Sequence, residues 1–305
     1  MVHLVIPQRL AETAVQWEGD RGRAWLDDLP RLVTDVSTAW GLEVGSPFLP
    51  GGQISWVAPA RRRADGLDAV LKVQLPHPES DPEAAGLRAW GGDGAVRVFH
   101  HDPARSALLI ERCHPGSGLD ALSGSDDAVV AGAALGARLH VAAAPPGLPT
   151  LATVLDSWAD ELAERLVHPF VEAGLDRLAL DTMRTRPRAC AAPVLLHGDL
   201  NPTNVLAADR QPWLAIDPKP MTGDPAYDGA RLVTQPDPLA TPDPAATLAR
   251  RLDIVRDTMG VDRDGLVLWC LVGEVEMGAA ARSHGDAASA SGCADLARLV
   301  AAHLP

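Results

Sequence analysis

The chain has 305 residues, which is long enough for two packed domains or one large one. A composition with 47% hydrophobic and 22% charged residues is ordinary for a soluble globular protein. Its formal net charge of −13 argues against nucleic acid as a partner, because phosphate-binding surfaces need clustered lysine and arginine. The same acidity suits a cationic small molecule, although charge also serves solubility alone.

No membrane segment or signal peptide is expected. The best apolar run, which starts at Ala128, is interrupted by Arg138 and His140, well short of the length that spans a bilayer. The N-terminus has no basic patch before an apolar core. The cysteines lack metal-ligand spacing, as is typical of reduced thiols in a cytoplasmic protein. They are Cys113, Cys190, Cys270 and Cys293.

The first part of the chain predicts a small lobe of about five strands and one inserted helix, ending near Cys113. Residues 8–40 predict one or two helices, and residues 48–62 predict a strand, a glycine turn and a second strand. The apolar residues spaced for the buried helix face are Leu10, Val15, Trp17, Trp25, Leu26 and Leu29. The later elements are a strand, a helix and two strands, at 69–75, 78–92, 95–102 and 106–113.

The rest of the chain predicts a larger, mainly helical lobe. Two long helices are expected at 125–144 and 151–170. A hairpin is expected over 193–220, and the chain beyond Asp228 is expected to be mostly helical around a proline-rich loop at 235–244. The tryptophans are expected in the core.

Only two of the 27 basic residues are lysines. Lys72 lies in the middle of the apolar strand "AVLKVQL", where an unpaired charge would be costly. We expect it to pair with Glu83 at the start of the following helix, with Glu79 as the other candidate. Lys219, in "AIDPKP", either contacts phosphate or substrate or is a surface lysine at a strand end.

A second group of polar residues lies in "LLHGDLNPTN", between two apolar segments that predict buried strands. The side chains of His197, Asp199 and Asn204 must either form hydrogen bonds within the protein or serve a function there. Polar groups left unpaired between buried strands are costly in free energy. Asp217 ends the next strand in "LAIDP". Phosphoryl transfer from ATP needs three such groups: a lysine–glutamate pair, a loop with Asp and Asn, and a second aspartate on the neighbouring strand.

Each of these residues has an expected role. Asp199 would accept the proton of the attacking hydroxyl, and Asn204 and Asp217 would offer hard oxygen ligands to Mg²⁺. Lys72, aimed by Glu83, would bind the phosphates. His197 is expected to hold the loop by hydrogen bonds. The alternatives are a plain turn at Asp199 and Asn204, or a metal site on His197 and Asp199, for which no other histidine is suitably placed.

Three further acidic residues are possible substrate ligands. Asp228, like Asp224, is expected to cap a helix and brace a loop more readily than to bind substrate. Glu274 and Glu276 are two positions apart and so cannot share one helical face well. One of the two could face the cleft and meet a guanidinium or an amine.

The sequence pattern "HGDLNPTN…AIDPKP…GDPAYD" resembles that of the aminoglycoside phosphotransferase family, most closely its branch of streptomycin 6-phosphotransferases and hydroxyurea phosphotransferases. The resemblance extends over most of the chain, through "VLKV", "EAAGLRAW", "GAVRV" and "LLIER". It implies an α+β, two-lobed, protein-kinase-like fold, with residues 1–113 as the nucleotide-binding lobe and 114–305 as the catalytic and substrate lobe. It also implies ATP and Mg²⁺ as cofactors.

The resemblance assigns the hinge to "LIERC", so that backbone groups from Glu111 to Cys113 would meet adenine. The phosphate loop "LPGGQISWV" departs from the protein-kinase pattern, because it offers only Gly51 and Gly52, with Ser55 nearby. The metal motif reads Asp-Pro-Lys in place of Asp-Phe-Gly.

These features predict a cytoplasmic, ATP-dependent phosphotransferase that acts on a small polar hydroxyl compound, with no nucleic acid or membrane partner. The leading substrate is streptomycin at its 6-hydroxyl, and the acidity of the chain suits this cation. Hydroxyurea or another small hydroxyl compound is the alternative within enzymes. A pseudokinase, which binds nucleotide without turnover, is the alternative of another class. A protein kinase is disfavoured because no activation segment is present.

Overall fold

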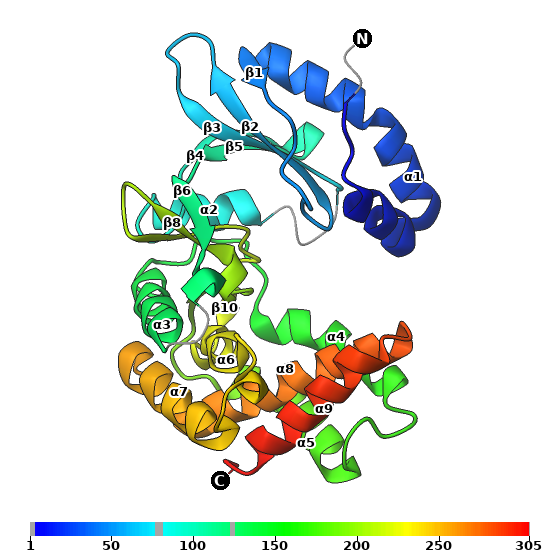
Figure 1. Ribbon diagram of the computed structural model, residues 1–305, viewed down its shortest axis with the longest axis vertical. Coiled ribbons are helices and arrows are strands. Elements are labelled where there is room, and N and C mark those ends of the chain that lie inside the picture. The colour runs from blue at the N-terminus through cyan, green and yellow to red at the C-terminus, as the bar shows by residue number, and fades with distance from the viewer. Residues whose placement is uncertain (1–3, 77–81, 123–125, 305) are drawn as a thin grey trace. The chain divides into compact units, whose positions relative to one another are not determined.

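A computed structural model describes residues 4–76, 82–122 and 126–304. The chain divides into two compact units, Met1–Gly116 and Ser117–Pro305, which run from blue to cyan and from green to red in Figure 1. The sequence-based division at residue 113 falls three residues earlier. Its assignment of nucleotide and substrate roles to the two parts remains a prediction.

The first unit is built on a five-stranded sheet in the order β1-β2-β3-β5-β4, with antiparallel neighbours. Its strands are β1 (Leu42–Val44), β2 (Ser55–Arg62), β3 (Asp68–Gln74), β4 (Val98–Asp102) and β5 (Ala107–Glu111). β3 is the central strand and is buried at every position after Asp68. The strand predicted at residues 48–50 is wrong, because this segment is a loop and β1 supplies the fifth strand.

Two helices flank this sheet. The long helix α1 (Gln8–Ala39) packs its apolar side on one face, where it meets Leu71 and Val73 of β3. Lys72 and Gln74 alternate with these residues and so point to the other face, where the short helix α2 (Glu83–Trp90) lies. The alternation thus separates an apolar face from a face that carries charge.

Helix α1 is broken at Gly19, whose backbone angles (φ 55°, ψ −122°) are not helical. The break shifts the helical phase, so the buried face before Gly19 does not continue the buried face after it. The prediction of a single apolar face is therefore wrong at Trp17, which is 52% exposed, while Leu10, Trp25 and Leu29 are buried as expected.

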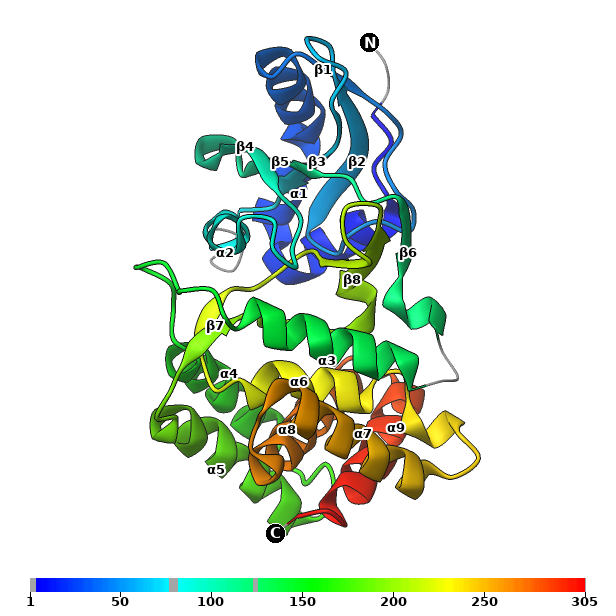
Figure 2. The ribbon, with the colours of Figure 1, turned by 90° about the vertical axis from the view of Figure 1, so that its left-hand side faces the viewer.

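The second unit is mainly helical and contains two small sheets. Its helices are α3 (Asp127–Leu139), α4 (Leu151–Arg165), α5 (Ala173–Ala189), α6 (Ala226–Thr234), α7 (Pro244–Met259), α8 (Arg263–Ser283) and α9 (Ala287–Ala301). Figure 2 shows α3 running beside α6 and α7. The helices predicted near α3 and α4 are confirmed, whereas α5 lies in a stretch for which the sequence predicted no element.

The small sheets position the polar loop noted in the sequence. β7 (Val194–Leu196) pairs with β10 (Met221–Gly223), and β8 (Val205–Ala208) forms the predicted hairpin with β9 (Trp213–Ala215), with β6 (Pro115–Gly118) as the third strand beside β8. The segment from His197 to Asn204 therefore joins two sheets and is held at both of its ends.

No helix in the described parts of the chain combines the length and the apolar character needed to cross a bilayer.

Candidate active site

The first unit contains the predicted ion pair between Lys72 and Glu83. The ammonium nitrogen of Lys72 donates to both carboxylate oxygens of Glu83, at 2.9 and 2.7 Å, and the two side chains are only 5% and 2% exposed. Glu79, the other candidate partner, lies outside the described residues. Gln74 also donates to Glu83, at 2.6 Å, and was not singled out from the sequence. Its position two residues after Lys72 on the same strand face was the available signal.

The two glycines of the predicted phosphate loop have conformational reasons to be glycine. Gly51 has a φ of +85°, in the left-handed region. A Cβ on Gly52 would lie 2.9 Å from the carbonyl oxygen of Ser55, the buried first residue of β2. The loop is thus a tight turn into β2, and its contact with phosphate remains a prediction.

The predicted hinge residues lie at the end of β5. Glu111 accepts a hydrogen bond from the backbone N–H of Arg97 at 3.0 Å, so its side chain is engaged within the sheet. Cys113 is buried. A role for this segment in binding adenine would rest on its backbone groups and stays a prediction.

In the second unit, two asparagines hold the carboxylate of Asp199. The side-chain amide of Asn201 donates to one oxygen at 3.0 Å, and that of Asn204 donates to the other at 3.1 Å. The side-chain amide oxygen of Asn201 in turn accepts from the backbone N–H of Thr203 at 2.9 Å and caps a 3-10 turn. Asn201 was missed in the sequence, where it looks like an ordinary turn residue.

His197 connects this loop to the strand that carries Asp217. Complete burial lowers the pKa of its imidazole, so the ring is neutral and has one donor and one acceptor nitrogen. Its Nδ1 accepts from the backbone N–H of Asp199 at 3.3 Å, and its Nε2 lies 3.1 Å from the carbonyl oxygen of Ile216. One neutral tautomer, protonated on Nε2, satisfies both contacts. This supports the loop-holding role and leaves neither nitrogen for a metal.

Asp228 anchors the same loop from α6. Its carboxylate accepts from the backbone N–H groups of His197 and Gly198, each at 2.8 Å, and lies 3.0 Å from Nε2 of His140. Burial alone would raise the pKa of Asp228, but the hydrogen bonds that its carboxylate accepts from His140 and from the backbone N–H of His197 lower the pKa below its ordinary value. The burial of this carboxylate and its hydrogen bonds favour the bracing role for Asp228. Asp228 also lines the pocket beside Asp199, and its contact with substrate remains a prediction.

Asp224, the other expected brace, caps the start of α6. One of its oxygens accepts from the backbone N–H of Ala226 at 3.0 Å. The other accepts from Arg186 at 2.8 Å and from the indole of Trp269 at 2.9 Å. The cap therefore ties α6 to both α5 and α8.

The residues predicted to hold Mg²⁺, Asn204 and Asp217, carry oxygen atoms of the kind that this ion binds, and their role as a metal site remains a prediction. The amide nitrogen of Asn204 is bonded to Asp199, which directs its amide oxygen away from that carboxylate. Asp217 follows Ile216, whose N–H donates to the carbonyl oxygen of Asn204 at 2.9 Å. The described residues hold no cluster of three or more His, Cys, Asp or Glu for a metal. Two protein oxygens suit Mg²⁺, which usually keeps waters and takes substrate phosphates as its other ligands.

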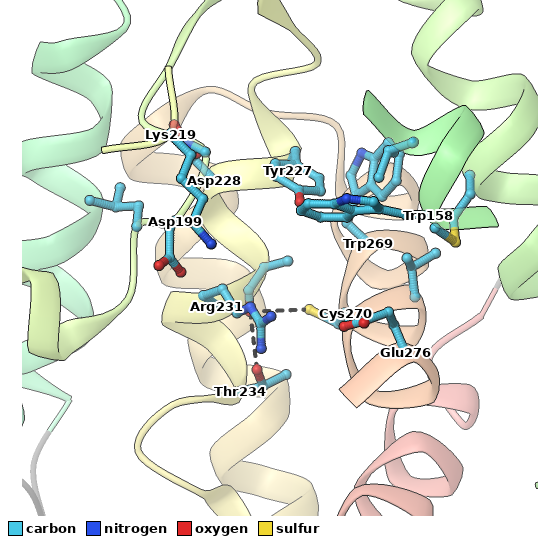
Figure 3. Close-up of a pocket in the computed structure, with 17 residues that line it drawn as sticks. Trp158, Asp199, Lys219, Tyr227, Asp228, Arg231, Thr234, Trp269, Cys270 and Glu276 are labelled. Carbon is cyan, nitrogen blue, oxygen red and sulfur yellow. Dashed lines mark hydrogen bonds between the residues drawn. The ribbon is translucent and has the colours of Figure 1, made fainter. Parts of the chain in front are cut away.

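A pocket lies beside Asp199, within the second unit (Figure 3). Its wall contains Trp158 and also Tyr227, whose ring meets Trp269 edge-on with centroids 5.3 Å apart. Glu276 lines it as well, with a side chain 29% exposed and 3.7 Å from Arg165. Trp158 thus departs from the expectation that the tryptophans are core residues.

Glu274 and Glu276 of α8 face different surroundings, as their spacing predicted. Glu274 does not line the pocket and is only 3% exposed. Burial raises the pKa of Glu274 to about 7, partly offset by the charge of Arg231 and by hydrogen bonds to Thr234 and Cys293. Of the two, Glu276 is the one placed to meet a ligand.

Comparison with known proteins finds a family model and relatives that agree with one another. A family model described as aminoglycoside/hydroxyurea antibiotic resistance kinase matches residues 44–285. The chain is 37% identical to a streptomycin 6-kinase of Streptomyces griseus over 281 residues, which cover 88% of each chain. It is 38% identical to a hydroxyurea phosphotransferase of Kitasatospora aureofaciens over 273 residues, 87% of this chain and 77% of that one.

A solved structure shares the fold. The chain resembles a choline/ethanolamine kinase family protein from Mesorhizobium loti with a TM-score of 0.62 at 14% identity, covering 88% of this chain and 94% of that one. The likeness concerns the fold alone. With the small sheet of the first unit and the helices of the second, it confirms the α+β, kinase-like fold predicted from the sequence.

Gly198→Ala should destabilise the protein by about 3 kcal/mol, because a Cβ there would lie 2.1 Å from the carbonyl oxygen of Lys219, at a residue whose φ is +79°. Urea unfolding measures the change. Gly292→Ala is the matched control, since it lies in α9 with nothing within 4 Å of the added Cβ, and should change stability by at most about 1 kcal/mol. Equal effects of the two substitutions would contradict the close approach at Gly198.

Glu274→Gln should stabilise the protein at pH 8 and have little effect at pH 5. The folded-state pKa of about 7 lies above the ordinary value of 4.5, so this group's contribution is present below 4.5 and is lost as pH rises through 7. The gain at pH 8 should approach about 3 kcal/mol. Urea unfolding at both pH values, with exposed Glu164→Gln as control, measures it. A gain independent of pH would mean that Glu274 is charged throughout this range.

Proposed function

The chain belongs to the family of aminoglycoside and hydroxyurea antibiotic resistance kinases, and from this premise we propose that it transfers the terminal phosphoryl group of ATP to the 6-hydroxyl of streptomycin. The observation that carries the proposal is the carboxylate of Asp199, which two asparagines hold at the edge of a pocket that Glu276 also lines. Phosphorylation would inactivate the antibiotic, and we place the reaction in the cytoplasm, where ATP is available.

The protein's residues divide the work of the reaction. Asp199 accepts the proton as the acceptor hydroxyl oxygen bonds to the γ-phosphorus, while the bond to the β-phosphate oxygen breaks and ADP leaves. Lys72, oriented by Glu83, binds the phosphates of ATP. Asn204 and Asp217 would hold Mg²⁺, which neutralises phosphate charge when bound.

The pocket supports a cationic acceptor. The carboxylate of Glu276 is partly exposed, and its nearest cation, Arg165, is 3.7 Å away and also pairs with Glu161 at 3.2 Å. A guanidinium group from a ligand can approach the same carboxylate and stack on the ring of Trp158. The net charge of −13 attracts such a ligand over a longer range.

Hydroxyurea is the second candidate acceptor, because a hydroxyurea phosphotransferase is 38% identical to this chain. It is small and neutral, so it would gain nothing from the carboxylate of Glu276. The two acceptors are therefore distinguished by their dependence on this one charge.

ATP consumption by the purified protein with Mg²⁺ should be stimulated by streptomycin and not by hydroxyurea. The product should carry one phosphate on the 6-hydroxyl, as checked by NMR. Asp199→Asn should lower turnover about a thousandfold while ATP still binds, because the base is lost and the loop is not. Asp209→Asn, in the exposed turn between β8 and β9, is the control. Turnover near normal in Asp199→Asn would refute the base assignment, and turnover with hydroxyurea alone would refute the acceptor.

Glu276→Gln should raise the KM for streptomycin about tenfold, because a charge-assisted contact is replaced by a neutral one. The matched control is Glu161→Gln, which removes the other carboxylate partner of Arg165 and does not line the pocket. Steady-state kinetics with each acceptor measures the change. A KM that rises equally in both variants would point to Arg165, and not to the substrate, as the partner that matters.

A further inference from the structure

The pocket wall contains a guanidinium that no carboxylate neutralises by direct contact. Arg231 of α6 lines the pocket (Figure 3). Within the described parts of the chain it forms no ion pair, and its side chain donates to the sulfur of Met277. Other arginines of this unit, such as Arg186 and Arg188, bind carboxylates. Thioether sulfur is a weak acceptor, so most of the hydrogen-bonding capacity of Arg231 is unused.

A second unused donor lies one helical turn earlier. Tyr227 is the single tyrosine of the chain and also lines the pocket. Burial raises the pKa of its phenol far above the ordinary value, so the hydroxyl keeps its proton. Its hydroxyl has no hydrogen-bond partner among the residues that the structure describes. Because Tyr227 and Arg231 are four residues apart in a helix, both side chains emerge on the same face.

We propose that Arg231 and Tyr227 form a donor pair that binds an oxygen atom of the acceptor other than the reacting hydroxyl, and so determines which hydroxyl reaches Asp199. All three residues line one pocket, and the charge of Asp199 acts on the phenol of Tyr227. This inference rests on the proposed function, since it concerns the acceptor of the same reaction.

The chemistry of the pair specifies the partner. A guanidinium has only donors, and a protonated phenol beside it can donate as well. Such a pair selects hydroxyl, ether or carbonyl oxygen, and the guanidinium repels a cationic group. Glu276 selects the opposite kind of group. An acceptor with a cation at one end and oxygen at the other therefore has one favoured orientation, which is the requirement for phosphorylating a single hydroxyl among several.

The test measures regiochemistry together with kinetics in Arg231→Met and Tyr227→Phe. Each should lower kcat/KM for streptomycin about ten- to a hundredfold, as expected when a hydrogen bond that orients substrate is removed. The phosphorylated product, resolved by NMR and mass spectrometry, should change from one isomer to a mixture. The KM for ATP should not change. Arg298→Met, an exposed arginine paired with Glu172, is the control.

A purely structural role for Arg231 has a distinct signature. If Arg231 only offsets the buried charge of Glu274, then adding Glu274→Gln should restore activity to the Arg231→Met variant. If Arg231 instead donates a hydrogen bond to the substrate, adding Glu274→Gln should not restore activity. Two results would overturn the donor pair. One is restored activity in the double variant, and the other is a single-isomer product with unchanged kcat/KM in both single variants.

The result for the acceptor is separable from the result for the donor pair. If the wild-type protein phosphorylates hydroxyurea and not streptomycin, the proposed acceptor is wrong. The same variants measured with hydroxyurea, which offers a carbonyl oxygen, still decide the donor pair by kcat/KM. A wild-type protein that phosphorylates neither compound would overturn both.

Discussion

The loop that carries the proposed base, Asp199, depends on one buried carboxylate, that of Asp228. Three donors converge on it, the backbone N–H groups of His197 and Gly198 and the ring of His140. They compensate the loss of water, so the group stays charged in a position where an uncompensated ion would be costly. Asp199 follows Gly198 directly, and its direction is therefore set by an anchor on α6.

The protein buries other acidic groups with different results, and the number of donors explains the difference. Glu83 accepts two hydrogen bonds from Lys72 and one from Gln74, all three being described residues, and these bonds hold a buried ion pair inside the first unit. Among the residues that the structure describes, no cation pairs with Glu274, and burial outweighs the charge of Arg231, so the pKa of Glu274 rises to about 7. Buried carboxylates with strong donors fix geometry here, while one without them becomes sensitive to pH.

The parts of the site that could be predicted are those whose members lie close together in the sequence or share a strand face. His197, Asp199 and Asn204 lie within one loop, and Lys72 finds Glu83 eleven residues on. His140 could not be found in this way, because 88 residues separate it from Asp228 and nothing in "ARLHVAA" marks it as polar support.

The fold shows the same limit. Strand alternation and helix punctuation located β2 to β5 and α2, because burial on one face leaves a local pattern. The phase of α1 could not be derived, because the break at Gly19 separates two local patterns that look continuous in the sequence. Helix α5 was missed for another reason: it is rich in charged residues and contains Pro187, a residue that ordinarily breaks a helix.

Helix α6 links the position of the proposed base to the shape of the pocket. The carboxylate of Asp228 accepts hydrogen bonds from the loop that carries Asp199, and Asp228, Tyr227 and Arg231 all line the pocket. Asp224 fixes the start of this helix through Arg186 and Trp269. A shift of α6 would therefore move the proposed base and one wall of the pocket together. Substitutions that alter acceptor choice without loss of turnover are thus expected on the pocket side of α6 or on α8, where Glu276 contributes charge without holding the loop.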